Sequence, residues 1–219
     1  MARAERGETW AHVQRIRLQA GEVGAALDEV RALLDVSGAI VCSWWLSDRT
    51  PPALDDALVA HGLTIDADDH EIDGLLLTRE PPPGPPDVEA RRLMHAAELA
   101  AAQELQWEVF GIPPDRRRPH TVGDDSRVYG AWVDGRLAGA ARAYFGPRGA
   151  MLAGGATAEW ARGRGAYRAL VRARWDDAAA RGTPALGVHA KNTSSPILRR
   201  LGFERVLQFR RLQDVRSEG

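Results

Sequence analysis

Residues 150–182 read AMLAGGATAEWARGRGAYRALVRARWDDAAARG, and this stretch decides how the rest of the chain is interpreted. It opens with the apolar run 150–153, which is typical of a buried strand, and then reaches a basic glycine turn at 162–167. From Tyr167 to Trp175 apolar residues recur at helical spacing, and Gly182 followed by proline ends the pattern. The predicted order is strand, glycine-arginine turn, helix.

The glycine turn has the features of an anion site. Gly163 and Gly165 lack a Cβ, so the backbone can approach a ligand closely. The first amides of the next helix have no intrahelical partner, and they lie at the positive end of its dipole. Arg162 and Arg164 add guanidinium groups that bind phosphate oxygens in pairs. We expect a pyrophosphate here, although a solvated basic turn is the alternative for an isolated RGRG.

Two familiar phosphate loops are not matched. The chain has no GxxxxGK[ST], and Arg168 stands where a GxGxxG loop would need its third glycine. The turn instead resembles the R-x-x-G-x-G/A loop of the GNAT acyl-CoA N-acyltransferase superfamily, with Tyr167 in place of the last Gly or Ala. The wider run GGAT…ARGRGAYRALV…RGTPAL…PILRRLGF is similar to one bacterial branch of that superfamily, and the likeness covers about residues 86–215.

The resemblance implies an α/β protein with the GNAT fold, whose mixed central sheet is splayed at the CoA-binding strands. The pantetheine arm of acetyl-CoA would lie in the gap between the strand before the loop and the next parallel strand. The cofactor contacts implied for this sequence are Gly155, Ala156, Thr157 and Ala158 on the strand, Arg162, Gly163, Arg164, Gly165, Ala166 and Tyr167 in the loop, and Asn192 and Ser194 on the other side.

The catalytic acid of the family is not found at its usual place. In the resembling enzymes it is commonly a tyrosine in the helix before a Gly-Phe pair, and here Leu198 stands at that position. Ser194, Ser195, a water or Tyr167 are the candidate substitutes, of which Ser195 is the residue that we carry forward. A CoA-binding protein without strong transferase activity therefore stays open as an alternative.

The candidate base is His189, at the end of the strand predicted for 185–190. An imidazole titrates in the range that proton removal from an amine requires, whereas a structural histidine is the alternative. Glu159 lies nearer the loop and is expected to be solvated. Direct attack of the amine on the thioester would owe much of its rate to proximity and orientation.

Composition limits the partners. The formal net charge is −1, from 29 basic and 30 acidic side chains, which argues against nucleic-acid binding. The single cysteine, Cys42, excludes an intrachain disulfide and makes a metal cluster unexpected. The N-terminus resembles no signal peptide, and no apolar run approaches the roughly 20 residues of a membrane span. We expect a cytoplasmic monomer or homodimer that holds no metal.

A proline-rich segment, EPPPGPP at 80–86, divides the chain. We predict a small α/β N-terminal domain at 1–80, a linker at 81–87 and a GNAT acetyltransferase domain at 88–219. Residues 39–63 and 185–203 share a strand, a polar turn, a Pro-containing helix and a Gly stop. We therefore interpret 1–80 as a degenerate GNAT-like half, and chance similarity of two α/β units is the alternative.

Further elements follow from local pattern. In the N-terminal part we predict helices at 22–36 and 53–61 and strands at 39–46, 63–65 and 72–78. Trp44-Trp45 either lines an acceptor pocket or divides between the core and the neighbouring domain. Further on we predict a helix at 88–110, a hairpin across Asp134-Gly135, a helix opened by Pro196 and a last strand at 203–215.

The lid over the acceptor site is expected to be short. The resembling family normally has a second helix after the first, and here only Asp115 to His120 and a short polar stretch intervene. The basic run 116–118 either steers an anionic substrate or forms a solvated loop. Three functions remain: an acetyl-CoA-dependent N-acetyltransferase acting on a small-molecule or peptide amine, a CoA-binding sensor or scaffold, and other thioester chemistry on the same fold.

Overall fold

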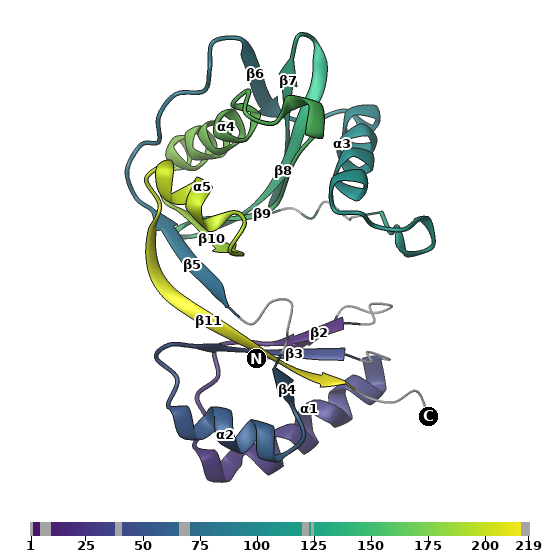
Figure 1. Cartoon of the computed structure of the whole chain (residues 1–219), viewed down its shortest axis with the longest axis vertical. Helices are drawn as coiled ribbons and strands as arrows, with labels where there is room; N and C mark the ends of the chain where they lie inside the picture. Colours follow the sequence, from purple (N-terminus) through teal and green to yellow (C-terminus); the bar gives the residue numbers. More distant parts are fainter. Residues whose placement is uncertain are drawn as a thin grey trace. The chain divides into compact units, whose positions relative to one another are not determined.

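The computed structural model describes residues 2–4, 10–37, 41–65, 71–119, 123 and 125–215 (Figure 1). The chain forms two compact units, which we call the N-terminal unit and the central unit. The N-terminal unit comprises Met1–Gly74, Ala190–Thr193 and Val206–Gly219, and the central unit comprises Leu75–His189 and Ser194–Arg205. Both units are α/β, and strands β5 (Ile72–Leu77) and β11 (Glu204–Val215) contain residues of each.

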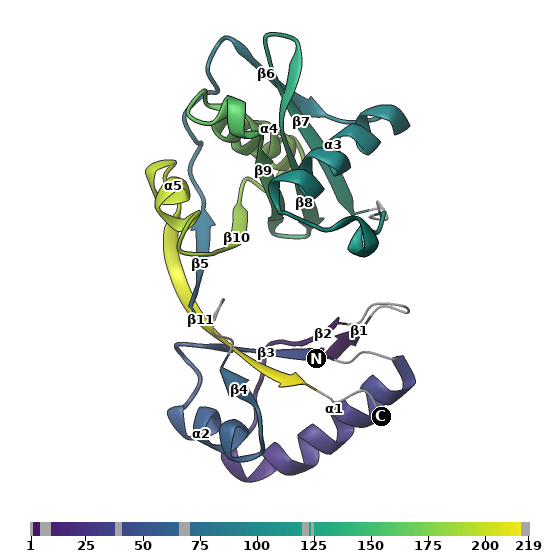
Figure 2. The same cartoon turned by 45° about the vertical axis from the view of Figure 1, so that its right-hand side comes forward.

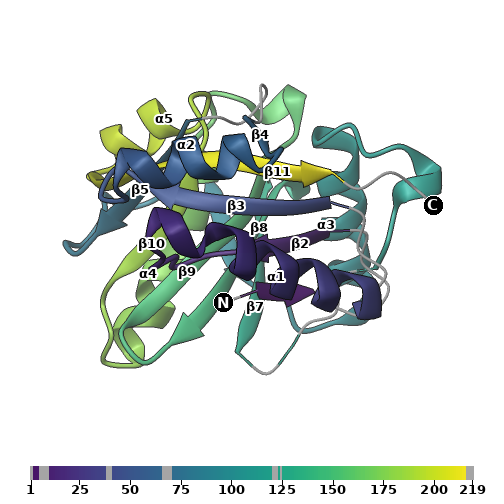
Figure 3. The ribbon, with the colours of Figure 1, turned by 90° about the horizontal axis from the view of Figure 1, so that it is seen from below.

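A sheet with helices on one face forms the N-terminal unit. Its strand order is β1-β2-β3-β11, and β4 pairs with β11. The β2–β3 pair is parallel and the others are antiparallel. Helices α1 and α2 lie against this sheet (Figure 3). The bounds are β1 Ala2–Ala4, β2 Trp10–Val13, the 3₁₀ turn η1 Ala20–Glu22, α1 Val23–Ser37, β3 Val41–Ser47, α2 Pro52–Ala60 and β4 Thr64–Ile65.

The predicted apolar stripe of α1 forms the core of this unit. Leu27 and Leu34 pack with Cys42 and Trp44 of β3, and all four side chains are buried. Side chains alternate between the two faces along β3, so Cys42 and Trp44 both lie on the face that the helices cover, as expected for a sheet with one buried side. The helices and strands predicted for this part of the chain are confirmed with boundary shifts of one or two residues.

A mixed sheet with one helix on each face forms the central unit. Its strand order is β5-β10-β9-β8-β7-β6, where β5 contributes Leu75–Leu77; the β9–β10 pair is parallel, and the pairs β8–β9, β7–β8 and β6–β7 are antiparallel. Helix α3 lies on one face and α4 on the other (Figure 2). The bounds are β6 Val88–Arg92, α3 Ala96–Val109, η2 Pro114–Arg116, β7 Ser126–Val133, β8 Arg136–Gly146, β9 Gly149–Thr157, η3 Glu159–Ala161, α4 Ala166–Ala180, β10 Leu186–Ala190 and α5 Ser195–Arg200.

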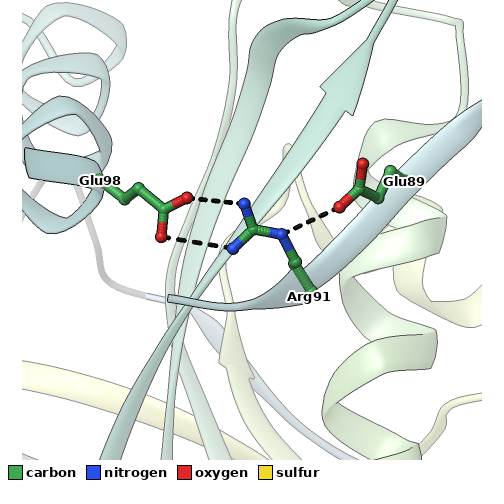
Figure 4. A network of polar contacts seen from close by, with 3 residues as sticks. All are labelled: Glu89, Arg91 and Glu98. Carbon is green, nitrogen blue, oxygen red and sulfur yellow. Dashed lines mark hydrogen bonds and ion pairs between the residues drawn. The ribbon is translucent and has the colours of Figure 1, made fainter. Parts of the chain in front are cut away.

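The prediction of one helix from Val88 to Phe110 is wrong at its start. Residues 88–92 form the edge strand β6, paired antiparallel with β7, and the helix begins only at Ala96. Arg91 links this strand to α3 (Figure 4): its guanidinium lies 2.6 Å from Glu98 of α3 and 2.9 Å from Glu89 of the same strand. Local propensity favoured a helix, and pairing with β7 overrides it.

The proline-rich segment packs against α4 inside the central unit. Arg172 of α4 donates to the carbonyl of Pro81 at 3.3 Å and forms an ion pair with Glu80 at 2.7 Å. A Cβ on Gly84 would lie 3.0 Å from Cβ of Ala169. Residues 206–215 of β11 belong to the N-terminal unit, although we predicted them to be part of the acetyltransferase domain at 88–219. The division at 81–87 remains a prediction.

Candidate functional site

Strands β9 and β10 pair only at their beginnings. The parallel pairs are Ala150 with Leu186, Met151 with Gly187 and Leu152 with Val188. Beyond Leu152, β9 continues to Thr157 with β8 as its paired neighbour, and no β10 residue is in register with it among the described residues. This separation lies where the resemblance expects the CoA-binding strands to part.

A bulge interrupts β9 at the point where the strands part. The register with β8 shifts between the pairs Ala140–Ala156 and Arg142–Ala153, so Gly154 and Gly155 together face one residue of β8. Gly154 has φ +58°, a left-handed conformation that favours glycine. Both glycines are exposed. Bulges of this kind redirect main-chain groups and bend the strand.

The bulge is held from both faces of the sheet. On the α3 side, Nε2 of Gln106 donates a hydrogen bond to the carbonyl of Gly154. On the α4 side, a Cβ on Gly155 would lie 2.7 Å from Cε2 of Tyr167. Gln106 is 5% exposed, although it is polar. In the sequence its one signal is a polar residue beside Leu105 within the apolar pattern of a helix, and it was not among the predicted site residues.

The predicted glycine loop forms the start of α4. Gly163 has φ +79° and Gly165 has φ +84°, and Gly165 is the N-cap of the helix. No side chain caps this end among the described residues, so the amides that follow Gly165 lack a side-chain partner. A Cβ on Gly165 would overlap Cγ of Pro85, from the proline-rich segment. The loop therefore leaves the N-terminus of α4 open, which is a general feature of anion sites in proteins.

The two loop arginines differ in their contacts. Nη1 of Arg164 lies 2.8 Å from Oδ2 of Asp134 in the β7–β8 turn. Arg162 lies 3.9 Å from Glu159 and its side chain is 65% exposed. Glu159 is exposed, in agreement with its predicted solvated position. Arg162 is thus the loop cation with the weaker carboxylate contact.

Tyr167 points its side chain toward the sheet. Its ring lies against Gly155, and its phenol oxygen faces the guanidinium of Arg174. Arg174 is fully buried, with Nε bonded to the carbonyl of Leu170 at 2.9 Å and Nη1 to that of Arg142 at 3.3 Å. Burial raises the pKa of Tyr167 and lowers the pKa of Arg174. The tyrosine is therefore neutral and held by a buried cation.

The candidate acid and base lie around the end of β10. His189 is on β10, and partial desolvation by its surroundings lowers the pKa of its imidazole. Ser194 is the N-cap of α5 and Ser195, its first residue, is buried. Leu198 is fully buried, so an apolar core side chain occupies the position of the family's tyrosine. Asn192 is exposed and belongs to the residues of the N-terminal unit.

The tryptophan pair is divided between the two faces of β3. Trp44 is a core residue. Trp45, on the opposite face, makes edge contacts with Phe209 at 6.0 Å and with His12 at 6.3 Å between ring centroids. The guanidinium of Arg211 lies 5.8 Å from the centre of the Trp45 ring. Trp44 is therefore a core residue, in agreement with the alternative that placed one tryptophan of the pair in the core. Acceptor binding by Trp45 remains a prediction.

The segment after α3 is compact where the structure describes it. Residues 110–119 contain the 3₁₀ turn η2 and no second α-helix. Arg117 binds Glu104 at 3.2 Å and the carbonyl of Ile112 at 3.1 Å, so this member of the basic run is tied to α3. His120 of the predicted lid lies outside the described residues. None of the described helices is both long and apolar enough to span a membrane.

Comparison with known proteins gives a family match and several structural matches. Residues 90–203 match the sequence model of the acetyltransferase (GNAT) family. A GCN5-related N-acetyltransferase from Kribbella flavida aligns with a TM-score of 0.74 at 21% identity, covering 96% of this chain and 82% of that one.

A GCN5-related N-acetyltransferase from Sphaerobacter thermophilus gives a TM-score of 0.68 at 17% identity, with 96% and 73% of the chains covered. A tandem GNAT protein from the clavulanic acid biosynthesis pathway gives 0.66 at 17%, with 97% and 77% covered. No curated protein sequence is similar enough to count as a match. At these identities, the structural likeness concerns the fold.

Proposed function

This chain belongs to the acetyltransferase (GNAT) family, and on that basis we propose that it is an acetyl-CoA-dependent N-acetyltransferase. It transfers the acyl group to a primary amine of a small molecule or a peptide. The observation that carries the proposal is the uncapped glycine loop at the start of α4, which follows the strand that parts from β10 after the short turn η3. These features suit a CoA thioester, and membership of the family makes acetyl-CoA the proposed donor.

The described residues fit this donor. Gly163 and Gly165 give the loop a backbone that a pyrophosphate can approach, and the following amides are available as donors. Arg162 is exposed and adds a cation. The main chain of Gly155 to Ala158 would contact the pantetheine arm, and Ser194 would contact the cofactor from the other side, while a contact from Asn192 remains a prediction from the resemblance. Acetyl-CoA supplies an acyl group activated as a thioester.

In the proposed reaction the amine nitrogen attacks the thioester carbonyl, a C–N bond forms and the C–S bond breaks. His189 accepts the proton from the attacking amine, for which its lowered pKa keeps it neutral near pH 7. Ser195 or a water gives a proton to the departing CoA sulfur and regains one as His189 releases the proton that it took from the amine, so the protons balance. Most of the rate comes from holding the amine and the thioester together. The products are the N-acyl amine and free CoA.

One observation favours a second function. Leu198 fills the position of the usual acid with a buried apolar side chain, and the described residues after α3 form only a short turn. A CoA-binding GNAT-fold sensor or scaffold with weak or no transferase activity would tolerate both features. Turnover separates the two functions, because both require CoA binding.

The N-terminal unit is proposed as a reduced GNAT-like half preceding the acetyltransferase domain, in a domain order of 1–80, 81–87 and 88–219. The similarity of the whole chain to a tandem GNAT protein supports this proposal. We further propose a cytoplasmic monomer or homodimer.

The deciding experiment measures CoA release from acetyl-CoA across a panel of amines, beside calorimetric binding of CoA. Turnover with one amine class identifies the acceptor and establishes the enzyme. CoA binding without turnover on any amine supports the sensor. A chain that binds no CoA overturns the assignment of Arg162 to Tyr167.

A further inference from the structure

Gln106 is a buried polar side chain with one identified task. It lies on the face of α3 that packs on the sheet, close to the core formed by Ala102, Leu105 and Ala156. Its Nε2 donates to the carbonyl of Gly154, in a strand distant along the chain. A buried side-chain amide gains little net stability from one such bond, so the main effect of this hydrogen bond is on the conformation of β9.

The bond fixes the orientation of one peptide group. In a trans peptide the carbonyl of Gly154 and the N–H of Gly155 point in opposite directions. Since the carbonyl is held by Gln106, the N–H of Gly155 is directed away from that side chain. The glycine at 154 is left-handed, with φ +58°, so its peptide would rotate easily without this anchor. The hydrogen bond from Gln106 therefore acts on the same peptide group, Gly154–Gly155, at which the bulge occurs.

We propose that Gln106 is a positioning residue, which aims the Gly155 N–H at the carbonyl oxygen of the bound thioester. This inference rests on the proposed function. A hydrogen-bond donor placed before the reaction stabilises the oxygen that gains negative charge as the amine attacks. Gln106 touches no substrate atom in this proposal and acts through the Gly154–Gly155 peptide.

The test compares Gln106→Met with the matched control Gln103→Met. Gln103 is on the same helix, and its Nε2 donates to the carbonyl of Arg118 at 3.3 Å. We expect Gln106→Met to lower kcat by roughly 10- to 100-fold, the scale of a lost donor to a developing oxyanion. The Kd of CoA, which lacks the acyl carbonyl, stays within about twofold of the wild-type value because the phosphate loop is untouched. Gln103→Met leaves kcat and both affinities unchanged.

A second readout works without turnover. The wild-type protein should bind acetyl-CoA more tightly than CoA through the Gly155 amide, and Gln106→Met should abolish this preference. An unchanged kcat and an unchanged preference would overturn the positioning role. Equal losses of affinity for CoA and acetyl-CoA would also overturn it, because they indicate a merely structural residue. If the wild-type protein binds CoA but transfers nothing, the transferase fails while the preference still decides the role of Gln106.

Discussion

Nη1 of Arg164 lies 2.8 Å from Oδ2 of Asp134, so the β7–β8 hairpin turn holds one arginine of the proposed phosphate loop. Asp134 itself adopts φ +52°, and Gly135 follows with φ +73°. The turn that closes the hairpin therefore places a carboxylate beside a cation that a pyrophosphate would also attract. The charge available to the ligand is smaller than the sequence RGRG suggests.

Asp134→Asn should strengthen CoA binding. Asparagine keeps the shape and tolerates positive φ, and the freed Arg164 offers its full charge to the phosphates. An exposed ion pair is worth up to about 1 kcal/mol, so the Kd should fall by roughly two- to fivefold. Calorimetric titration with CoA at low and high salt measures this. Asp176→Asn, which breaks the exposed pair with Arg172 on α4, is the control, and weaker binding in Asp134→Asn would contradict the prediction.

Gly165→Ala should be far more harmful than Gly163→Ala. Both glycines have positive φ, which costs an alanine roughly 1–2 kcal/mol. A Cβ at 165 also overlaps Pro85, whereas one at 163 meets nothing within 4 Å. We expect Gly165→Ala to lower stability by about 3 kcal/mol and to impair CoA binding. Urea unfolding of the two variants compares them directly, and equal losses would show that Pro85 yields to the added methyl group.

We expect the pH profile of kcat/KM to have an acid limb that reflects protonation of His189. Because partial desolvation lowers the pKa of its imidazole, the neutral base is present at pH 7 and becomes protonated only below the ordinary value of 6.5. The rate kcat/KM should thus fall as the pH drops, with its midpoint below 6.5. His189→Gln should abolish this limb and lower the rate by roughly 100-fold or more. His61→Gln, at the end of α2, serves as the control. A limb that survives in His189→Gln would exclude this base.

Arg31→Met should destabilise the N-terminal unit. Arg31 of α1 binds Asp214 of β11 with two contacts of 2.9 Å, and the Asp214 side chain is 6% exposed. Removing the cation leaves a buried carboxylate unpaired, at a cost of about 3 kcal/mol. Arg210→Met is the matched control, because its partner Asp55 is 25% exposed, and we expect about 1 kcal/mol there. Equal losses of unfolding free energy in the two variants would contradict the prediction that burial of Asp214 makes its pair with Arg31 the more important one.

The fold was predictable where local signals agree with tertiary structure. The glycine stop of α4, the Asp134-Gly135 hairpin and the apolar stripe of α1 each specify an element by themselves. Residues 88–92 show the opposite case, because four of the five are good helix formers and become a strand only through pairing with β7. The extension of β9 from 153 to Thr157 likewise depends on a neighbour and not on its small side chains.

The candidate site was predictable as a loop but not as a set of contacts. Gly163 and Gly165 have the positive φ that the loop requires. No sequence pattern reveals that Arg164 is paired with Asp134 or that Gln106 reaches Gly154. Each of these contacts joins residues of different elements, whose relative position only the folded chain determines. Tyr167 and Arg174 differ, because helical spacing alone places them on one face of α4.

Cys42 gives the molecule a practical property. It is the single cysteine of the sequence, and its side chain lies in the core of the N-terminal unit. Burial, with a smaller contribution from Asp214, raises the pKa of its thiol to about 12. A thiol in this state reacts slowly with disulfide and maleimide reagents. The protein thus contributes almost no background when released CoA is quantified through its sulfur, and a cysteine introduced on β9 could be labelled selectively without first removing the native one.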